Sequence, residues 1–386
     1  MPDKADVTTR RLEGLLRGIT RRKPIAQAVV AVESGNRAFR WVGTQGETGS
    51  GDRVVEDTPF FIASIDKLYN ATIAMLLSEA GGLDLDEPIS AYLSTSITRG
   101  LHQYRGSDYS EKVTVRHLLT HTSGLADWLE DYPKGGPSLF EGILLDGDRA
   151  LSIEEWTAHV RDKLKPHFPP QDLSGRHPKA RYSDTNFMLV IAIIEAVTGQ
   201  PLNEVHERML YKPLGLQHTY FPGLSRPMVR VRDPMVLRAR GKPLNIPLLI
   251  KSVRGIYSTA GDMITFLRAL MQGEVLQTPE TLASMLSSWH RFGFPLDRAA
   301  IRSPGWPIEY GTGVMRFRLP RLFTPAAPMP AVLGHTGSTG CWLFFCPELD
   351  VLLAGSVDEA TAGAVPFRTV PKILSALRSK EGMARE

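Results

Sequence analysis

The chain has few of the features that mark disulfide-stabilised, metal-binding or membrane-spanning proteins. Its 386 residues include only two cysteines, Cys341 and Cys346. Their odd separation along a predicted strand points the side chains to opposite faces, so neither a disulfide nor a cysteine metal site is expected. No run approaches the ~20 apolar residues of a membrane-spanning helix. The charged residues 1–6 lack the apolar core of a signal peptide, and we therefore expect a cytoplasmic protein without a membrane span.

An excess of one charge is also missing. The net charge is +4 for the whole chain, and the isoelectric point near 9.0 is weak evidence for a polyanionic partner, so nucleic acid binding is not implied. The hydrophobic fraction of 42% is that of a globular protein with a sizeable core. The length exceeds one average domain and suits a large catalytic unit or two closely joined subdomains.

Predicted strands lie at both ends of the chain, and most predicted helices lie between them. This order predicts an α+β fold, in which an antiparallel β-sheet is flanked by helices and carries a helical subdomain. We expect one catalytic unit, its α/β part formed by about residues 1–90 and 300–386 and its mostly helical part by about 91–299. The strands are predicted at residues 26–32, 38–43, 311–317, 331–334, 341–346 and 351–356, and the outer helices at 8–22 and 365–377.

The segment that begins at Ser64 combines a hydroxyl with a lysine at helical spacing. Apolar residues after Ser64 recur with a helical period, so Ser64 should begin a helix and Lys67 should lie one turn later on the same face. A nearby amine of depressed pKa can take the proton of a serine nucleophile, and a helix N-terminus can stabilise an oxyanion. Such a pair is common, however, and alone it more often means an N-cap serine and a solvated lysine.

Two further segments could meet Ser64 at one site. Tyr182 precedes Ser183 and Asp184 at a loop-to-helix junction, where nearby cations would favour its phenolate. The glycine-rich residues 334–340 lie between two predicted strands, where glycine lets a ligand approach the backbone closely. Each segment alone is more often a packing tyrosine or an ordinary hairpin.

Together the three segments resemble the serine β-lactamase and penicillin-binding-protein superfamily. The similarity is greatest to its class C β-lactamase-like branch of esterases, D-aminopeptidases and acyltransferases. Residues 64–67 match Ser-x-x-Lys, residues 182–184 match Tyr-x-Asn, and residues 335–337 match Lys-Thr-Gly. The resemblance covers nearly the whole chain in the expected order. Flanking residues also look similar, at 117–125, 213–216 and 257–262.

The resemblance implies a mechanism and a set of site residues. Ser64 would form an acyl-enzyme, Lys67 and Tyr182 would share the acid and base work, and the N–H groups of Ser64 and Ser338 would form the oxyanion hole. His335 would complete the catalytic set. No metal or organic cofactor is implied. His117 and His121 are four positions apart, but no third metal ligand stands out, so the resemblance makes them structural.

Two positions depart from the pattern of β-lactamases. Asp184 replaces a neutral asparagine, and when ionised it would favour the ammonium form of Lys67. His335 replaces the lysine that usually anchors a substrate carboxylate, which favours neutral esters or amides. On this basis we expect His335→Lys to improve the binding of carboxylate-bearing substrates.

The remaining candidate residues concern the substrate cleft. Asp184, Trp128, Thr336 and Gly337 are candidate substrate contacts. The segment around Trp128, up to residue 149, reads as a long irregular surface loop, and its first part and residues 222–250 should border the cleft. Trp128 could equally anchor the loop onto the helical part.

The leading hypothesis is a hydrolase of carboxylic esters with a small-molecule substrate. Three alternatives within the fold are an amidase or D-aminopeptidase, a β-lactam-hydrolysing enzyme and an acyltransferase. A catalytically silent binding protein on the same scaffold is a lesser alternative, against which the joint presence of Ser64, Lys67 and Tyr182 argues. The acyl group, the leaving group and the oligomeric state are not predicted.

Overall fold

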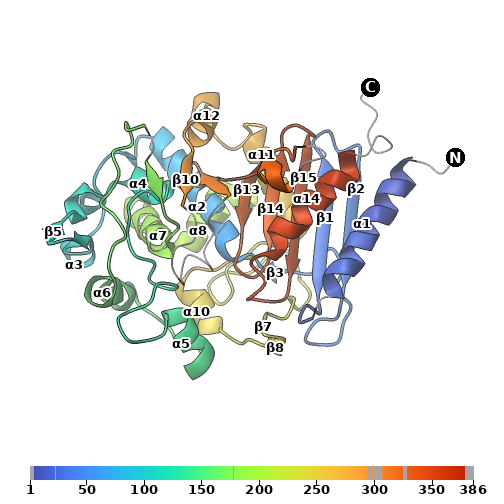
Figure 1. Cartoon of the computed structure of the whole chain (residues 1–386), viewed down its shortest axis with the longest axis horizontal. Coiled ribbons are helices and arrows are strands. Elements are labelled where there is room, and N and C mark those ends of the chain that lie inside the picture. The colour runs from blue at the N-terminus through green and yellow to red at the C-terminus, as the bar shows by residue number, and fades with distance from the viewer. Residues whose placement is uncertain are drawn as a thin grey trace.

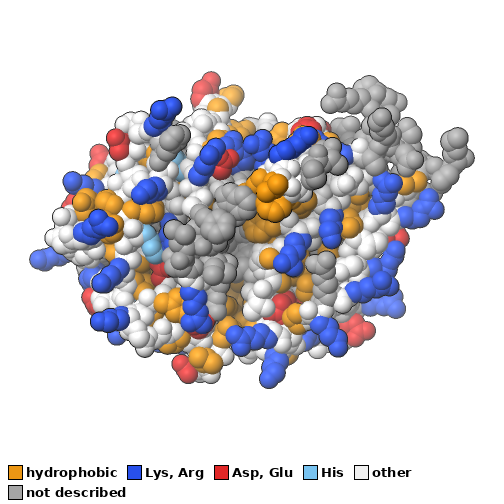
Figure 2. Space-filling view, viewed as in Figure 1, with side chains coloured by type: hydrophobic (Ala, Val, Ile, Leu, Met, Phe, Trp, Pro, Cys, Tyr) orange, Lys and Arg blue, Asp and Glu red, His pale blue; other side chains and the backbone are white. Residues whose placement is uncertain are grey.

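The computed structural model describes residues 4–21, 23–176, 178–293, 298, 307–324 and 328–378. Figure 1 shows a sheet with covering helices beside a mostly helical part. Within the described ranges no single helix is long and apolar enough to cross a membrane. One bent pair, Asp184–Thr198 with Leu202–Leu214, passes that test together, by length and composition only. Figure 2 shows lysine and arginine side chains spread over both parts of the face that it draws.

The main sheet has nine strands in the order β2-β1-β15-β14-β13-β12-β11-β10-β6. Strand β1 pairs with β15 from Ala28 opposite Val357 to Ser34 opposite Val351, so the two ends of the chain complete one sheet as predicted. Neighbours are antiparallel except β10 and β6, which are parallel. The expected antiparallel sheet is therefore mixed at this edge. The strands are β1 Ala28–Ser34, β2 Arg40–Gln45, β6 Lys179–Ala180, β10 His290–Phe292, β11 Ile308–Tyr310, β12 Met315–Phe317, β13 Val332–Thr336, β14 Trp342–Cys346 and β15 Val351–Val357.

The helices cover both faces of the sheet and form the neighbouring part. Short two-stranded pairs join β3 (Phe60–Phe61) to β9 (Tyr257–Ser258), β4 (Gln103–Tyr104) to β5 (Ser107–Asp108) and β7 (Arg238–Ala239) to β8 (Lys242–Pro243). The α-helices are α1 Lys4–Thr20, α2 Asp66–Glu79, α3 Thr95–Thr98, α4 Val115–Leu119, α5 Leu139–Asp146, α6 Ile153–Lys163, α7 Asp184–Thr198, α8 Leu202–His206, α9 Lys212–Leu214, α10 Pro247–Ser252, α11 Ala260–Met271, α12 Pro279–Ser287 and α14 Val365–Arg378.

Alternation along the strands sorts side chains into two cores. In β14, Trp342 and Phe344 join the core shared with α1 and α14, whereas Leu343 joins the core shared with α11. A period of two is the signature of a strand with different neighbours on its two faces. Cys341 and Cys346 also belong to different cores and are both free thiols. Helix α11 and strands β6 and β10 belong to the sheet part although they lie within residues 91–299.

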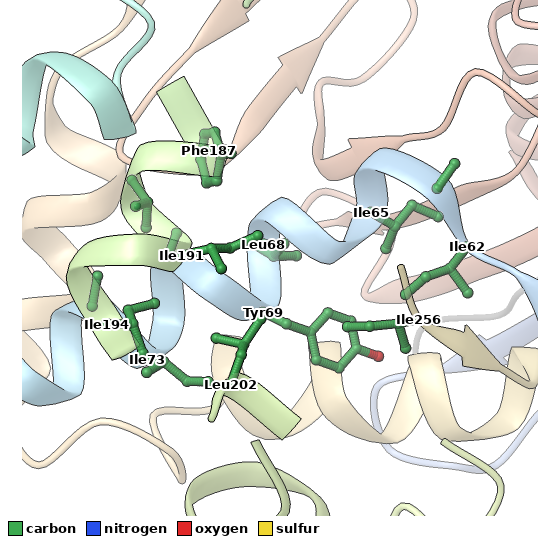
Figure 3. Close-up of a cluster of buried hydrophobic side chains, with 14 of the residues drawn as sticks. Ile62, Ile65, Leu68, Tyr69, Ile73, Phe187, Ile191, Ile194, Leu202 and Ile256 are labelled. Carbon is green, nitrogen blue, oxygen red and sulfur yellow. The ribbon is translucent and has the colours of Figure 1, made fainter. Parts of the chain in front are cut away.

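Helix α2 is buried around its whole circumference from Asp66 to Leu76. Figure 3 shows its side chains Leu68 and Ile73 beside Ile191 and Ile194 of α7. A helix that is enclosed on all sides owes its position to packing. The helix that carries Lys67 is therefore held rigidly at the junction of the sheet and the helical part.

Two local predictions need correction. The strand predicted at residues 311–317 is instead the turn after β11 followed by the short strand β12, Met315–Phe317. The segment from 126 to 149 is not irregular throughout, because it contains helix α5. Its Trp128 is only 1% exposed. Burial of the large indole ring against the helical part favours a packed conformation, although nearby glycines and prolines favour turns.

Candidate active site

Ser64 lies in a single 3-10 turn, η1 (Ala63–Ile65), that leads directly into α2. The residue before it, Ala63, has a φ of +45°, a conformation that a residue with a β-carbon adopts at a cost in strain. Lys67 follows one turn later, and its Nζ lies 3.2 Å from Ser64 Oγ. The predicted serine–lysine contact is therefore present, at a tight turn that leaves Ser64 half-buried on a pocket wall.

Lys67 is enclosed by two carboxylates. Its Nζ lies 2.6 Å from Asp184 Oδ1 and 3.7 Å from Asp66 Oδ1. Burial by itself would lower the pKa of Lys67, but the charges of Asp184 and Asp66 outweigh it and the pKa is raised. Lys67 is thus an ammonium group. Burial raises the pKa of Asp66 to about 6, against the lowering effect of Lys67.

Tyr182 connects the nucleophile to the same carboxylate. Its hydroxyl lies 2.7 Å from Ser64 Oγ and 2.9 Å from Asp184 Oδ1. Burial, reinforced by the negative charge of Asp184, raises the pKa of Tyr182 well above its ordinary value, so the side chain is a neutral phenol. Asp184 accepts from both Lys67 and Tyr182, which is the arrangement that the sequence singled out as opposing a lysine base.

The first turn of α7 is fastened to residues 126–128. The backbone N–H of Asp184 donates to Asp127 Oδ2 over 3.0 Å, and the Thr185 hydroxyl donates to the carbonyl of Ala126 over 2.6 Å. The N–H of Trp128 returns a hydrogen bond to Thr185 Oγ1 over 3.0 Å. These bonds set the position of the Asp184 carboxylate. Sequence reasoning missed Asp127, whose role comes from a neighbour far along the chain.

His335, which was expected to complete the catalytic set, lies away from the pocket lining. Its side chain is fully buried and is not among the described residues that line the pocket. Its Nε2 is hydrogen-bonded to the Tyr310 hydroxyl, and its Nδ1 lies 2.6 Å from the carbonyl oxygen of Thr336. Burial, aided by Lys67, lowers the pKa of His335 to about 3, so the imidazole is neutral. Both ring nitrogens are used inside the protein, and any catalytic effect of His335 would pass through Tyr310.

Thr336 and Gly337 also lie behind the pocket wall. Thr336 is buried, with its Oγ1 3.8 Å from Met315 Sδ. A β-carbon at Gly337 would come within 2.8 Å of the Ile62 carbonyl and 2.9 Å of Ala63 Cβ, so only glycine lets this strand end pack against the Ser64 turn. Neither residue lines the pocket, whereas Ser338 and the residue after it do.

A pocket with a cavity volume of about 90 Å³ opens beside Ser64. Trp128 lines it and also packs on Trp156, with ring centroids 6.4 Å apart, while its role as a substrate contact stays a prediction. Of the two segments predicted to border the cleft, the first lines this pocket with Trp128 and Leu129, and the second lines it only between residues 237 and 250. The lining residues are Phe61, Ala63, Ser64, Asp66, Lys67, Trp128, Leu129, Phe140, Asp184, Phe187, Met188, Ile191, Leu237, Leu244, Ile246, Leu249, Ile250, Val253, Ser338, Thr339 and Ala360.

An aromatic cluster that the sequence did not reveal supports Tyr182. The ring of His121 lies 4.7 Å from Tyr182 and 4.5 Å from Tyr310, edge to face with the latter. Its Nδ1 accepts the N–H of Ser183 over 3.2 Å, which helps to orient the residue after Tyr182. Burial lowers the pKa of His121 well below its ordinary value. In the sequence, only the family-like residues 117–125 around His121 pointed to this cluster, because Tyr310 lies far along the chain.

His117 does not face His121 as a metal ligand would. Its Nδ1 accepts the N–H of Thr114 over 3.0 Å, and its Nε2 lies 2.7 Å from the carbonyl of Gln171. Within the described ranges, no three His, Cys, Asp or Glu side chains are grouped so that they could hold a metal ion.

Comparisons with known proteins identify relatives that share most of this chain's length. The esterase EstB of Burkholderia gladioli is 26% identical over 330 residues, which cover 76% of this chain and 76% of EstB. The D-alanyl-D-alanine-carboxypeptidase/endopeptidase AmpH of Escherichia coli K12 is 26% identical over 321 residues, covering 82% of this chain and 74% of AmpH.

Solved structures extend the likeness to nearly the whole fold. A D-stereospecific amidohydrolase from Streptomyces sp. is 28% identical, with a TM-score of 0.68 over 97% of this chain and 98% of the neighbour. A class C β-lactamase, 19% identical with a TM-score of 0.69 and 97% of each chain covered, shows the same fold. The family model described as Beta-lactamase matches residues 12–364. This chain therefore belongs to the Beta-lactamase family and is a serine hydrolase.

Proposed function

We propose that the protein hydrolyses neutral carboxylic esters through an acyl-enzyme on Ser64. The observation that carries the proposal is the position of Ser64 Oγ, within 3.2 Å of Lys67 Nζ and 2.7 Å of the Tyr182 hydroxyl, on the wall of the pocket. Acyl transfer needs a nucleophile that contacts both a cation and a proton carrier and that faces a cavity for the substrate.

Proton transfer follows from the charges around Ser64. Lys67 is already an ammonium and Tyr182 a neutral phenol, so the available acceptor is the Asp184 carboxylate. As Ser64 Oγ attacks the carbonyl carbon, Tyr182 takes the serine proton and passes its own to Asp184 Oδ1. The carbonyl π pair moves onto oxygen, and Lys67 stabilises the negative charge that develops at Ser64. When the intermediate collapses, the bond to the leaving alkoxide breaks and the same proton returns to it through Tyr182.

The oxyanion would be held by the backbone N–H groups of Ser64 and Ser338. Both residues line the pocket, and the close packing of Gly337 on Ile62 and Ala63 brings the end of β13 beside the Ser64 turn. Water would then attack the acyl-enzyme by the same relay, which regenerates Ser64. If another alcohol entered instead of water, the product would be a new ester, so acyltransfer is a variant of the same chemistry.

An ester suits this site better than a β-lactam. Lys67 is the one Lys or Arg among the described lining residues, and its charge is already taken by Asp184. A substrate carboxylate would therefore lose its hydration without gaining an ion pair. Amide hydrolysis is the second candidate, because the Streptomyces neighbour is named a D-stereospecific amidohydrolase.

The test uses the purified full chain with a fluorophosphonate probe and three substrates: p-nitrophenyl acetate, D-phenylalanine amide and a chromogenic cephalosporin. Ester turnover should exceed the other two, and the probe should label Ser64. Ser64→Ala should abolish labelling and turnover, while Ser96→Ala, at an exposed residue of α3, should change neither. A probe adduct on another serine would refute the nucleophile, and a cephalosporin kcat/KM at or above that of the ester would refute the substrate class.

Cytoplasmic location stays a prediction, to be tested by fractionation of the native host. The absence of a nucleic acid partner and the single catalytic unit likewise stay predictions.

A further inference from the structure

We propose that the pocket beside Ser64 binds the acyl part of the substrate and selects an uncharged hydrocarbon chain of roughly six to eight carbons. This inference rests on the ester-hydrolase function proposed above and names the substrate class of that site.

The pocket is divided into a polar end and an apolar end. Its polar lining residues are Ser64, Asp66, Lys67, Asp184, Ser338 and Thr339, which belong to the Ser64 turn, the start of α2, the start of α7 and the turn after β13. The apolar end comes from one face of α7, from the segment around Trp128 and Phe140, and from residues 237–253. Every described lining residue from these three walls, Asp184 excepted, is hydrophobic.

This division excludes charged and strongly polar acyl groups. The carboxylates of Asp66 and Asp184 lie 3.7 Å and 2.6 Å from Lys67 Nζ, so the charged groups of the pocket are gathered at its polar end. An amino acid ammonium or a carboxylate placed farther in would meet only hydrocarbon and would lose its hydration without a partner. A methylene chain gains from the same environment, by roughly fourfold in affinity for each buried CH₂ group.

The position of Tyr182 assigns the pocket to the acyl side. The leaving alkoxide must lie beside the proton donor, and the Tyr182 hydroxyl reaches Ser64 at 2.7 Å. Tyr182 is nevertheless not among the described residues that line the pocket, whereas Phe187, Met188 and Ile191 of α7 are. The hydrocarbon end therefore extends away from the proton donor, where the acyl chain lies when the carbonyl carbon is at Ser64.

The wall formed by residues 237–253 is anchored to its surroundings. Asp148 accepts the N–H groups of Leu248 and Leu249 over 2.6 and 2.9 Å, and the hydroxyl of Ser252 accepts the N–H of Leu151 over 2.9 Å. These bonds fasten α10 to the chain between α5 and α6. The cavity of about 90 Å³ is several times the ~10–15 Å³ that one water requires. The pocket is therefore preformed and takes more than an acetyl methyl group.

The test measures kcat/KM for p-nitrophenyl esters from acetate to dodecanoate. We expect a rise of about two- to fourfold per methylene and a maximum at hexanoate or octanoate. Methyl octanoate should be a better substrate than octyl acetate, which presents the chain on the leaving group. Acetate as the best acyl group, or octyl acetate above methyl octanoate, would overturn the inference while ester hydrolysis and Ser64 labelling remained intact. Loss of all ester hydrolysis would instead overturn the proposed function.

A pair of variants tests the pocket itself. Leu244→Trp fills the apolar end from a half-buried position and should lower the octanoate-to-acetate ratio of kcat/KM at least tenfold. Leu248→Trp is the matched control, because Leu248 is 48% exposed and is not among the described lining residues. It should leave the chain-length profile unchanged. Equal profiles for Leu244→Trp and the wild type, at equal melting temperatures, would refute the assignment.

Discussion

Replacing Asp184 with asparagine separates two possible roles of Lys67. The carboxylate lies 2.6 Å from Lys67 Nζ. At an effective dielectric constant of about 20, this distance corresponds to a Coulomb attraction of about 6 kcal/mol. An amide of nearly the same shape removes that attraction and removes the proton acceptor of Tyr182. The pKa of Lys67 must then fall, because burial continues to disfavour the ammonium form.

If Asp184 is the terminal proton acceptor, Asp184→Asn should lower kcat/KM for the best ester at pH 7 by roughly 10²- to 10⁴-fold. Activity of the variant should recover as the pH rises toward 10, because Lys67 then loses its proton and can act as base. The wild type should show no such rise. If Lys67 were the base in the wild type, the variant would be faster at pH 7, and that result would refute the reasoning.

A double variant checks that the relay acts as one unit. Tyr182→Phe alone should cost about as much as Asp184→Asn, and the pair together should cost little more than either. Stopped-flow acylation rates measure the loss in each single variant and in the double variant, and circular dichroism confirms that each variant is folded. Losses that simply multiply would mean that Tyr182 and Asp184 act independently.

Three further predictions concern buried titrating groups. Burial raises the pKa of Asp66 from 3.8 to about 6, so ionisation of this carboxyl lowers the free energy of unfolding, by nothing below pH 3.8 and by the full amount above pH 6. Asp66→Asn should therefore add about 3 kcal/mol to the free energy of unfolding at pH 8 and much less at pH 4. Equal gains at the two pH values would contradict this prediction. His335→Lys would bury an ammonium beside Lys67 and should destabilise the protein by at least about 3 kcal/mol. Contrary to the expectation from sequence, it should not improve cephalosporin turnover. A stable variant that binds cephalosporin better would restore that expectation. Burial lowers the pKa of His206 to about 3, so the unfolded chain takes up this proton first and stability is lost as the pH falls from 6.5 toward 3. In urea titrations, His206→Gln should reduce the pH dependence of the free energy of unfolding between pH 6 and 4 by about 1.4 kcal/mol per pH unit. An unchanged slope would mean that His206 is protonated in the folded state.

Much of the fold could be predicted because periodicity records local environment. The alternation along β14 and β15 and the apolar spacing of α1 identified these elements with small errors at their ends. Strand β6 escaped detection because two residues carry no pattern, and its parallel pairing with β10 arises only when distant segments meet. The sequence left Trp128 between a cleft contact and a packing anchor, and only the structure shows that it is buried.

The sequence by itself determined the nucleophile segment. Ser64 and Lys67 are one helical turn apart, and that spacing alone brings their side chains within 3.2 Å. Tyr182 and Asp184 were recognisable as a motif, but their contacts depend on where α7 docks against α2. Only the tertiary structure decided that the Asp184 carboxylate lies on Lys67 and that His335 turns away from the pocket toward Tyr310. Protonation, burial and pocket shape are properties of several segments at once, and no single segment encodes them.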